Sequence, residues 1–337
     1  MFDVENRRYV GNKYKLMYWI NELIVDKCPN CKSFFDVFAG TGVVSKCLLN
    51  EFDSFILNDF LYSNEVIYHA FFDSSSVDMQ KISTIADDYC AIDREKLPEN
   101  YVSEQYGNKF FSLKDAKLIG YIREDIETQF KTNSITKSEY YVLLASLLYS
   151  SDRVANTCGH YDAYIKGKKI RDDFKFDTIA PLNTAGKGIS IFRRDSNELV
   201  REIAADIAFI DPPYNSRQYS RFYHVLENLT KWEKPELFGV AMKPKEENMS
   251  QYCRSTAPLV FSDLIENINA NYIVVTYNNT YNSKSSSSQN KITLEEIEEI
   301  LRKKGSTEVF KKPYRFFNAG KTTLPDHKEY LFITKVN

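Results

Sequence analysis

Residues 34–59 constrain the fold more than any other segment, because they follow the order strand, glycine turn, helix, strand, acid. The apolar run 34–38 leads into the turn Ala-Gly-Thr-Gly, and the apolar positions of 43–52 then predict a helix. A second apolar run, 54–57, predicts a buried strand that ends close to Asp59. Two strands joined through a helix are typical of a parallel sheet, so we predict a doubly wound α/β fold.

A long helical stretch interrupts this α/β pattern. Between residues 62 and 188 the sequence predicts no strand, only helices at 62–80, 113–128 and 138–149. The other predicted elements are strands at 188–192, 206–210 and 272–276, helices at 14–27, 198–204, 217–231, 258–269 and 293–304, and a hairpin at 307–317 and 328–335. We therefore predict one α/β domain formed by 1–61 and 188–337, with a mostly helical insertion at 62–187.

The composition is that of an ordinary globular protein, with 43% hydrophobic and 27% charged residues. No apolar run reaches the roughly 18 residues of a membrane-spanning helix, and the N-terminus is too polar for a signal peptide. Six scattered cysteines are too few for a disulfide scaffold, so we expect a cytoplasmic protein. Cys28 and Cys31 have the spacing of zinc ligands, but no second such pair exists, and we predict no metal site.

The glycine turn predicts a site for a nucleoside-containing cofactor. Gly40 and Gly42 allow positive φ angles and a close approach of the backbone to a ligand, and the following helix offers unpaired N–H groups. Asp59, at the end of the next strand, is placed to accept hydrogen bonds from ribose hydroxyls. Ser45 stands where a dinucleotide fingerprint has its third glycine, which disfavours NAD and FAD. The same pattern also fits a plain tight turn.

The sequence Asp211-Pro212-Pro213-Tyr214 follows a predicted strand and forms a stiff corner, since two prolines cannot continue a strand. This corner suits methyl transfer to an exocyclic amine, which is a poor nucleophile because its lone pair is delocalised. The Asp211 carboxylate and the Pro212 carbonyl can accept both amine hydrogens, and Tyr214 can stack on the base. The alternative is an ordinary loop that ends a strand.

The glycine turn, the helical insertion and the Asp-Pro-Pro-Tyr corner follow one another in the order found in a known family. The chain resembles the N6-adenine-specific DNA methyltransferases, in particular the Dam-like class. The resemblance implies a Rossmann-like sheet that binds S-adenosyl-L-methionine and methylates an adenine flipped out of a specific sequence of double-stranded DNA. It also implies that the insertion 62–187 is the target-recognition domain. The chain would then be the modification component of a restriction-modification system, beside a separate cognate restriction endonuclease.

The resemblance implies roles for individual residues. In the family motif that matches 9–13, Tyr9 packs on the cofactor and Lys13 pairs with its methionine carboxylate; Asn12 replaces a glycine that the family commonly has there. Asp195 matches the acid that contacts the cofactor's adenine, but it is also suited to cap the following helix. The further cofactor contacts that the resemblance implies are Asp36 and Gly40 for the methionine portion, Asp59 for the ribose, and Asp211 near the methyl donor and the base.

DNA contacts are predicted in three segments. Arg217 and Tyr219 follow the proline corner, and their side chains are suited to bind a flipped-out nucleotide. The alternative is that they lie in a solvent-exposed loop without a DNA contact. The net charge of the chain is only −2, so the clusters 160–194 (net +4) and 301–321 (net +6) are distinctive. We expect them to contact phosphates, with Lys168 and Lys169 in the first cluster.

Three other functions compete with DNA adenine methylation. RNA or protein methyltransferases of this fold more often have Asn at the position of Asp211. A non-catalytic DNA-binding partner would usually lose the proline corner or the glycine turn, and both are intact here. A cytosine carbon-5 methyltransferase needs a nucleophilic cysteine, usually after a proline, and the sequence has no Pro-Cys pair.

Overall fold

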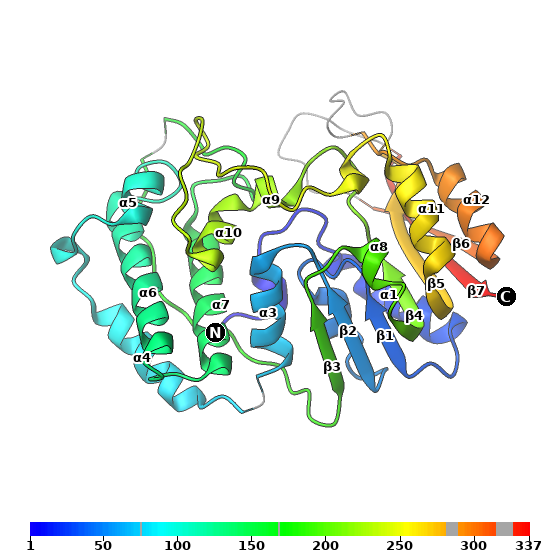
Figure 1. Cartoon of the computed structure of the whole chain (residues 1–337), viewed down its shortest axis with the longest axis horizontal. Helices are drawn as coiled ribbons and strands as arrows, with labels where there is room; N and C mark the ends of the chain where they lie inside the picture. The colour runs from blue at the N-terminus through cyan, green and yellow to red at the C-terminus, as the bar shows by residue number, and fades with distance from the viewer. Residues whose placement is uncertain (75, 168, 281–288, 315–325) are drawn as a thin grey trace. The chain divides into compact units, whose positions relative to one another are not determined.

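The computed structural model describes all residues of the chain except 75, 168, 281–288 and 315–325. The described residues form two compact units, shown in Figure 1. We call them the sheet unit and the helical unit. The sheet unit consists of Lys13–Phe60, Gly186–Tyr219 and Asn248–Asn337, and the helical unit of Met1–Asn12, Leu61–Ala185 and Ser220–Glu247.

A seven-stranded sheet with the order β3-β2-β1-β4-β5-β7-β6 forms the centre of the sheet unit. Neighbouring strands from β3 to β5 pair in parallel, whereas β7 runs antiparallel to both β5 and β6. The strands are β1 (Ser33–Asp36), β2 (Ser54–Asn58), β3 (Gly188–Phe192), β4 (Ala204–Ile210), β5 (Asn269–Asn278), β6 (Gly305–Pro313) and β7 (Lys328–Val336). The predicted doubly wound α/β sheet is confirmed.

Helices cover both faces of this sheet. Alternate side chains of the central strands, such as Phe35, Ala208 and Ile273, form one core with α8, α11 and α12, which lie over one face in Figure 1. The other face carries α1, where Trp19 packs against Lys312. The helices of the sheet unit are η2 (Tyr14–Leu16), α1 (Met17–Lys27), α2 (Val43–Cys47), α8 (Ser196–Leu199), η4 (Gln251–Cys253), α11 (Ala257–Asn267) and α12 (Leu294–Lys304).

The helical unit is built around packed pairs of helices, α3 with α7 and α5 with α6. Polar side chains fix the helix starts; Thr136, for example, forms a capping box with Glu139 at the start of α7. The helices are η1 (Val4–Asn6), α3 (Tyr62–Phe72), α4 (Met79–Ala91), η3 (Arg94–Lys96), α5 (Tyr101–Tyr106), α6 (Leu113–Lys131), α7 (Lys137–Val154) and α10 (His224–Lys231). The short α9 (Tyr219–Phe222) crosses the boundary between the units.

Some predicted elements were wrong in extent. The helix expected at 62–80 is two helices, because the chain leaves α3 after Phe72 and Asp78 caps the start of α4 through the N–H groups of Gln80 and Lys81. The helix expected at 198–204 ends at Leu199, since the chain enters β4 at Ala204.

The helical unit is also larger than the predicted insertion, because it takes in residues 1–12 and 220–247. Buried polar contacts hold these segments there. The Arg7 guanidinium donates to Asn64 on α3, and the Glu227 carboxylate accepts hydrogen bonds from the N–H groups of Tyr62 and Ser63.

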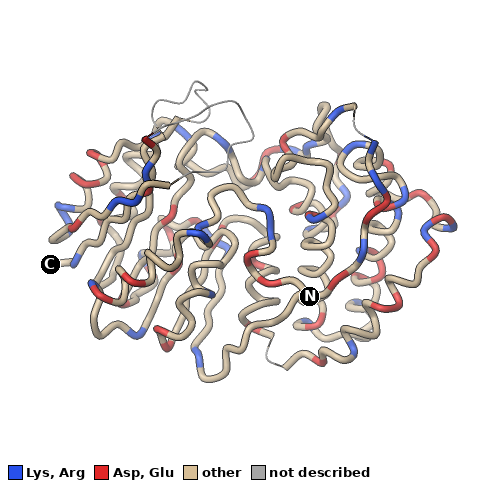
Figure 2. The backbone as a smooth tube through the Cα atoms, turned by 180° about the vertical axis from the view of Figure 1, so that it is seen from behind, with Lys and Arg blue, Asp and Glu red and all other residues tan. Residues whose placement is uncertain are grey.

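Acidic and basic residues are interspersed along the backbone of both units, as Figure 2 shows, in keeping with the small net charge. None of the helices in the described ranges is long and apolar enough to cross a membrane.

Candidate active site

Three predicted acids follow neighbouring parallel strands of the sheet unit. Asp36 ends β1, Asp59 follows β2 and Asp211 follows β4, and β1 pairs with both other strands. The carboxyl ends of parallel strands lie at one edge of a sheet, which is where open α/β folds bind ligands. The sheet therefore brings these three carboxylates to a single edge.

The glycine turn between β1 and α2 has the backbone that the sequence predicts. Gly40 (φ 55°) and Gly42 (φ 78°) are both left-handed, a conformation that favours glycine. The Gly40 N–H donates to Asp59 Oδ2 over 3.0 Å, and the Phe60 N–H donates to Asp59 Oδ1 over 2.7 Å. These two backbone hydrogen bonds fix the orientation of the Asp59 carboxylate. Its contact with a ribose stays a prediction.

Asp36 is a buried carboxylate, and one of its oxygens has no hydrogen-bond partner in the described part of the chain. The Ser45 hydroxyl donates to Oδ2 over 2.8 Å, while the oxygen that lacks a partner among the described residues is the buried Oδ1. Burial, together with the carboxylates of Asp211 and Asp59, raises the pKa of Asp36 to about 7, although the Ser45 hydrogen bond opposes the rise. An unpartnered acceptor near two other carboxylates fits a cationic donor, and the ammonium and sulfonium groups of S-adenosylmethionine are cations.

Asp211 is anchored through one oxygen only. Its Oδ1 accepts hydrogen bonds from Lys13 Nζ (2.9 Å), from Thr276 Oγ1 (2.8 Å) and from the Tyr214 hydroxyl. None of the hydrogen bonds among the described residues engages Oδ2. Burial alone would lower the pKa of Lys13, but Asp211 and Glu329 outweigh it and raise this pKa, so Lys13 is a cation.

Lys13 and Tyr214 are linked in a way that the sequence did not predict. Lys13 Nζ donates to the Tyr214 hydroxyl over 2.8 Å and lies 4.9 Å from the centre of its ring. The Tyr214 ring packs on Tyr277, with 4.5 Å between ring centres. Thr276 was also missed, although a polar residue at the end of the predicted strand 272–276 was a usable signal. The stacking of Tyr214 on a base and the pairing of Lys13 with the cofactor stay predictions.

Asp195 caps the start of α8, which was the alternative to its contact with the cofactor's adenine. It is exposed, and its Oδ1 accepts hydrogen bonds from the N–H groups of Asn197 (2.9 Å) and Glu198 (3.3 Å) at the start of α8. A cap of this kind leaves the second oxygen for a ligand. The contact with the cofactor's adenine stays a prediction, as does the role of the buried Pro212 carbonyl.

Tyr9 belongs to an aromatic cluster of the helical unit. Its ring stacks on Tyr223 with 4.8 Å between centres and an angle of 7° between the planes. The Arg7 guanidinium lies 5.1 Å and 5.4 Å from these two rings, and the Val10 N–H donates to the Tyr223 hydroxyl. Sequence reasoning missed this cluster because its members come from distant segments. The packing of Tyr9 on the cofactor stays a prediction.

The predicted DNA contacts differ in their surroundings. Arg217 and Tyr219 are half-buried; the Arg217 N–H donates to Asn215 Oδ1 over 3.1 Å. Lys169 is exposed, whereas Lys168 lies outside the described residues. Part of the cluster 301–321 lies outside them as well. DNA binding by these residues stays a prediction.

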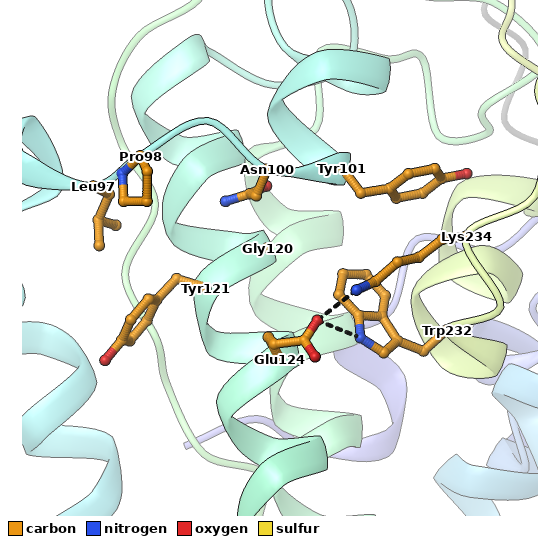
Figure 3. A pocket seen from close by; sticks show the side chains of 9 residues that line it. All are labelled: Leu97, Pro98, Asn100, Tyr101, Gly120, Tyr121, Glu124, Trp232 and Lys234. Atoms are coloured by element: carbon orange, nitrogen blue, oxygen red, sulfur yellow. Dashed lines mark hydrogen bonds and ion pairs between the residues drawn. The ribbon is translucent and has the colours of Figure 1, made fainter.

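The helical unit contains a pocket of about 180 Å³ (Figure 3). Its walls are mostly apolar, and Glu124 accepts hydrogen bonds there from Trp232 Nε1 (3.0 Å) and Lys234 Nζ (2.6 Å). The residues that line it are Leu97, Pro98, Asn100, Tyr101, Gly120, Tyr121, Glu124, Trp232 and Lys234. None of the predicted site residues is among them. Within the described ranges, no cluster of His, Cys, Asp and Glu could hold a metal ion.

The chain is similar to known DNA methyltransferases. The family model described as D12 class N6 adenine-specific DNA methyltransferase matches residues 9–300. The chain is 33% identical to the modification methylase LlaI of Lactococcus lactis subsp. lactis over 94% of its own length, but it spans only 52% of that relative. It is 29% identical to the type II methyltransferase M.NlaIII of Neisseria lactamica and 32% identical to M.CviAII of Paramecium bursaria Chlorella virus 1. Those alignments cover 96% and 97% of this chain and 98% of each relative.

Proposed function

Since the chain belongs to the D12 class N6 adenine-specific DNA methyltransferase family, we propose that it methylates the exocyclic amino group of adenine in a specific sequence of double-stranded DNA. The observation that carries this proposal is the state of Asp211. Three donors hold Oδ1, and Oδ2 is left for a substrate hydrogen bond. This carboxylate is preorganised, which is how an enzyme stabilises a developing charge without reorganising during the reaction.

Asp211 and Pro212 would act together on the target amine. The Asp211 Oδ2 and the Pro212 carbonyl accept its two hydrogens, which favours a nitrogen lone pair directed at the methyl donor. As the new N–C bond forms and the methyl–sulfur bond of the donor breaks, positive charge develops on the nitrogen, and the Asp211 carboxylate would stabilise it. One amine proton then leaves toward the same carboxylate. No covalent bond to the enzyme is needed.

The cofactor, S-adenosyl-L-methionine, supplies an activated methyl group when it is bound. Asp36, with its unpartnered oxygen, would accept a hydrogen bond from the methionine ammonium, and the turn at Gly40 would let the backbone approach it. Asp59 would hold the ribose hydroxyls. Tyr9, Lys13 and Asp195 complete the proposed cofactor contacts.

The names of the relatives support a place in a restriction-modification system. They are modification methylases and type II methyltransferases, so we assign this chain the modification role, with a separate endonuclease as partner. The helical insertion 62–187 would read the target sequence, and Arg217, Tyr219 and Lys169 would contact the DNA. All six cysteines are free, which suits a reducing cytoplasm.

The test is to sequence methylated adenines in DNA from cells that express the protein, and to repeat the reaction with purified protein, isotopically labelled cofactor and duplex DNA. We expect N6-methyladenine at one specific sequence, and none with the variant Asp211→Ala. Label incorporated into RNA or protein instead of DNA would overturn the proposal, as would the absence of methyladenine.

A further inference from the structure

A second carboxylate, Glu329, is buried beside the Asp211 cluster. Its side chain is only 6% exposed, and its Oε2 is buried without a hydrogen-bond partner in the part of the chain that the structure describes. Burying a carboxylate oxygen without a hydrogen-bond partner costs free energy. This cost points to a functional role for Glu329. Glu329 stands out from the rest of β7, where the other buried residues are apolar or threonine.

The sheet register places Glu329 next to the residues that hold Asp211. It pairs with Asn278 of β5, and Leu331 pairs with Thr276 two residues earlier on the same strand. Side chains two residues apart lie on one face of a sheet, so Glu329 and Thr276 share a face. Thr276 Oγ1 is one of the three donors to Asp211.

Glu329 acts electrostatically on the same groups. It is the second carboxylate, after Asp211, that raises the pKa of Lys13, and it also raises the pKa of the Tyr214 hydroxyl. Lys13 therefore interacts with two carboxylates at once. Since Asp211 bonds its ammonium directly, Glu329 provides the additional negative charge.

This additional charge matters for methyl transfer to an amine. Positive charge develops on the attacking nitrogen, and a neighbouring Lys13 cation would oppose it. We propose that Glu329 is a positioning residue that offsets the charge of Lys13, so that the Asp211 carboxylate keeps its full attraction for the amine in the transition state. This inference rests on the proposed DNA adenine methylation.

The proposal predicts a dependence of the reaction rate on pH. Burial and the Asp211 carboxylate together raise the pKa of Glu329 to about 7, although Lys13 opposes the rise. The other polar groups near Glu329 are Asn278 on β5, Lys312 opposite it on β6, Tyr214, and Tyr314, whose pKa Glu329 raises. Below pH 7 Glu329 is protonated and neutral. Only Asp211 then offsets the positive charge of Lys13. The rate should therefore rise with pH until Glu329 is ionised.

The test is single-turnover methyl transfer by the full chain, with saturating cofactor and duplex DNA, across pH 5.5 to 8.5, the range around the Glu329 pKa of about 7. Saturating cofactor removes the effect of pH on cofactor binding from the measured rate. We expect the wild-type rate to rise about tenfold in all as the pH rises through 7, and then to level off. Glu329→Gln should be about tenfold slower at pH 8 and independent of pH near 7. The matched control is Glu295→Gln, at an exposed position of α12; it should follow the wild type.

A further variant separates charge from packing. Glu329→Asp keeps the carboxylate, so it should keep the rise in rate with pH even if it is slower. The inference is overturned if Glu329→Gln has the wild-type rate and pH profile, or if the Asp and Gln variants lose the rise equally. If the wild type transfers no methyl group to DNA at any pH, the proposed function fails instead. Thermal unfolding and cofactor affinity of each variant show whether it has folded.

Discussion

Lys13 Nζ lies 2.9 Å from Asp211 Oδ1, in an ion pair whose side chains are only 5% and 19% exposed. Lys13 precedes the first helical segment of the sheet unit, and Asp211 follows β4, so the folded sheet unit joins two distant motifs. Removing one partner from a buried pair leaves the other charge uncompensated, which costs far more than losing an exposed pair. Lys13 is therefore a structural partner of Asp211 as well as a proposed cofactor contact.

The first prediction concerns this ion pair. Lys13→Met should lower the free energy of unfolding by about 3–5 kcal/mol, because Asp211 and Glu329 would remain buried without their common cation. Urea unfolding measures the loss. The control is Lys15→Met, at an exposed position nearby, which should change stability by no more than about 0.5 kcal/mol. Equal stability of the two variants would contradict the structural role of Lys13.

The second prediction separates chemistry from folding at Asp211. Asp211→Ala should reduce the rate of methyl transfer by about 10²–10³, or roughly 2.7–4 kcal/mol, because it removes a preorganised acceptor. Glu329 remains in this variant to offset Lys13, so the fold should persist. Turnover at saturating substrates and thermal unfolding measure the two effects. A variant with wild-type turnover would disprove the catalytic assignment.

The sequence predicted the sheet well because its central strands are buried on both faces. Such strands have continuous apolar runs; the predicted strand 206–210, for example, lies within β4, whose residues 207–210 are all buried. The edge strand β3 was also predicted, at 188–192. The acids after these runs were also predictable, because ligand-binding residues of α/β folds follow strand ends. The structure places Asp36, Asp59 and Asp211 at such strand ends, and their roles stay predictions.

The remaining features depend on contacts between distant residues. Glu329 lies in an ordinary strand sequence, and nothing local indicates that β7 places it beside Asn278 and near Lys13. The break after Phe72 was missed even though residues 73–76, Asp-Ser-Ser-Ser, are a sequence typical of a loop. The stacking of Tyr9 on Tyr223 was likewise invisible, since it joins the N-terminal segment to a residue next to α10.

The third prediction concerns Gly120, in the middle of α6 and in the pocket of Figure 3. Alanine normally favours a helix over glycine by about 1 kcal/mol. Here an added Cβ would collide with Asn100 Oδ1, which accepts hydrogen bonds from the N–H groups of Val102 and Ser103 at the start of α5. Gly120→Ala should therefore destabilise the protein, by about 1–3 kcal/mol, in urea unfolding.

A double-mutant cycle controls this prediction. In the background of Asn100→Ala the obstacle is gone, so Gly120→Ala should there become neutral or stabilising. If Gly120→Ala stabilises the otherwise unaltered protein, the contact with Asn100 is not the constraint that the structure indicates.

The fourth prediction concerns the Tyr214 hydroxyl. Tyr214→Phe keeps the ring on Tyr277 but removes the bonds to Lys13 and Asp211. Two hydrogen bonds with charged partners are lost, so turnover should fall by about tenfold or more, while DNA affinity, which depends mainly on phosphate contacts, should change little. Tyr214→Ala should be slower still, because it also loses the aromatic face. Wild-type turnover for Tyr214→Phe would show that only the ring matters.

The last prediction follows from the raised pKa of Asp36. A carboxyl whose pKa in the folded state is about 7, above its ordinary value near 3.8, takes up a proton on folding between these values. Its contribution to stability is complete below the ordinary value and is lost as the pH rises through 7. Asp36→Asn cannot ionise, so it does not lose this contribution as the pH rises. The free energy of unfolding of the variant, minus that of the wild type, should therefore be larger at pH 8 than at pH 6. Urea unfolding at both pH values measures this.

Cofactor binding should show the opposite trend, because the cations of S-adenosylmethionine need the ionised carboxylate. Below pH 7 the wild type must release the Asp36 proton on binding, so its affinity should rise by up to about tenfold per pH unit and level off above 7. Calorimetry in buffers of different ionisation enthalpy would detect the released proton at pH 6 and none at pH 8. Asp36→Asn should bind more weakly at pH 8 and release no proton at either pH. Wild-type affinity that is equal at pH 6 and pH 8 would show that Asp36 does not meet the cationic part of the cofactor.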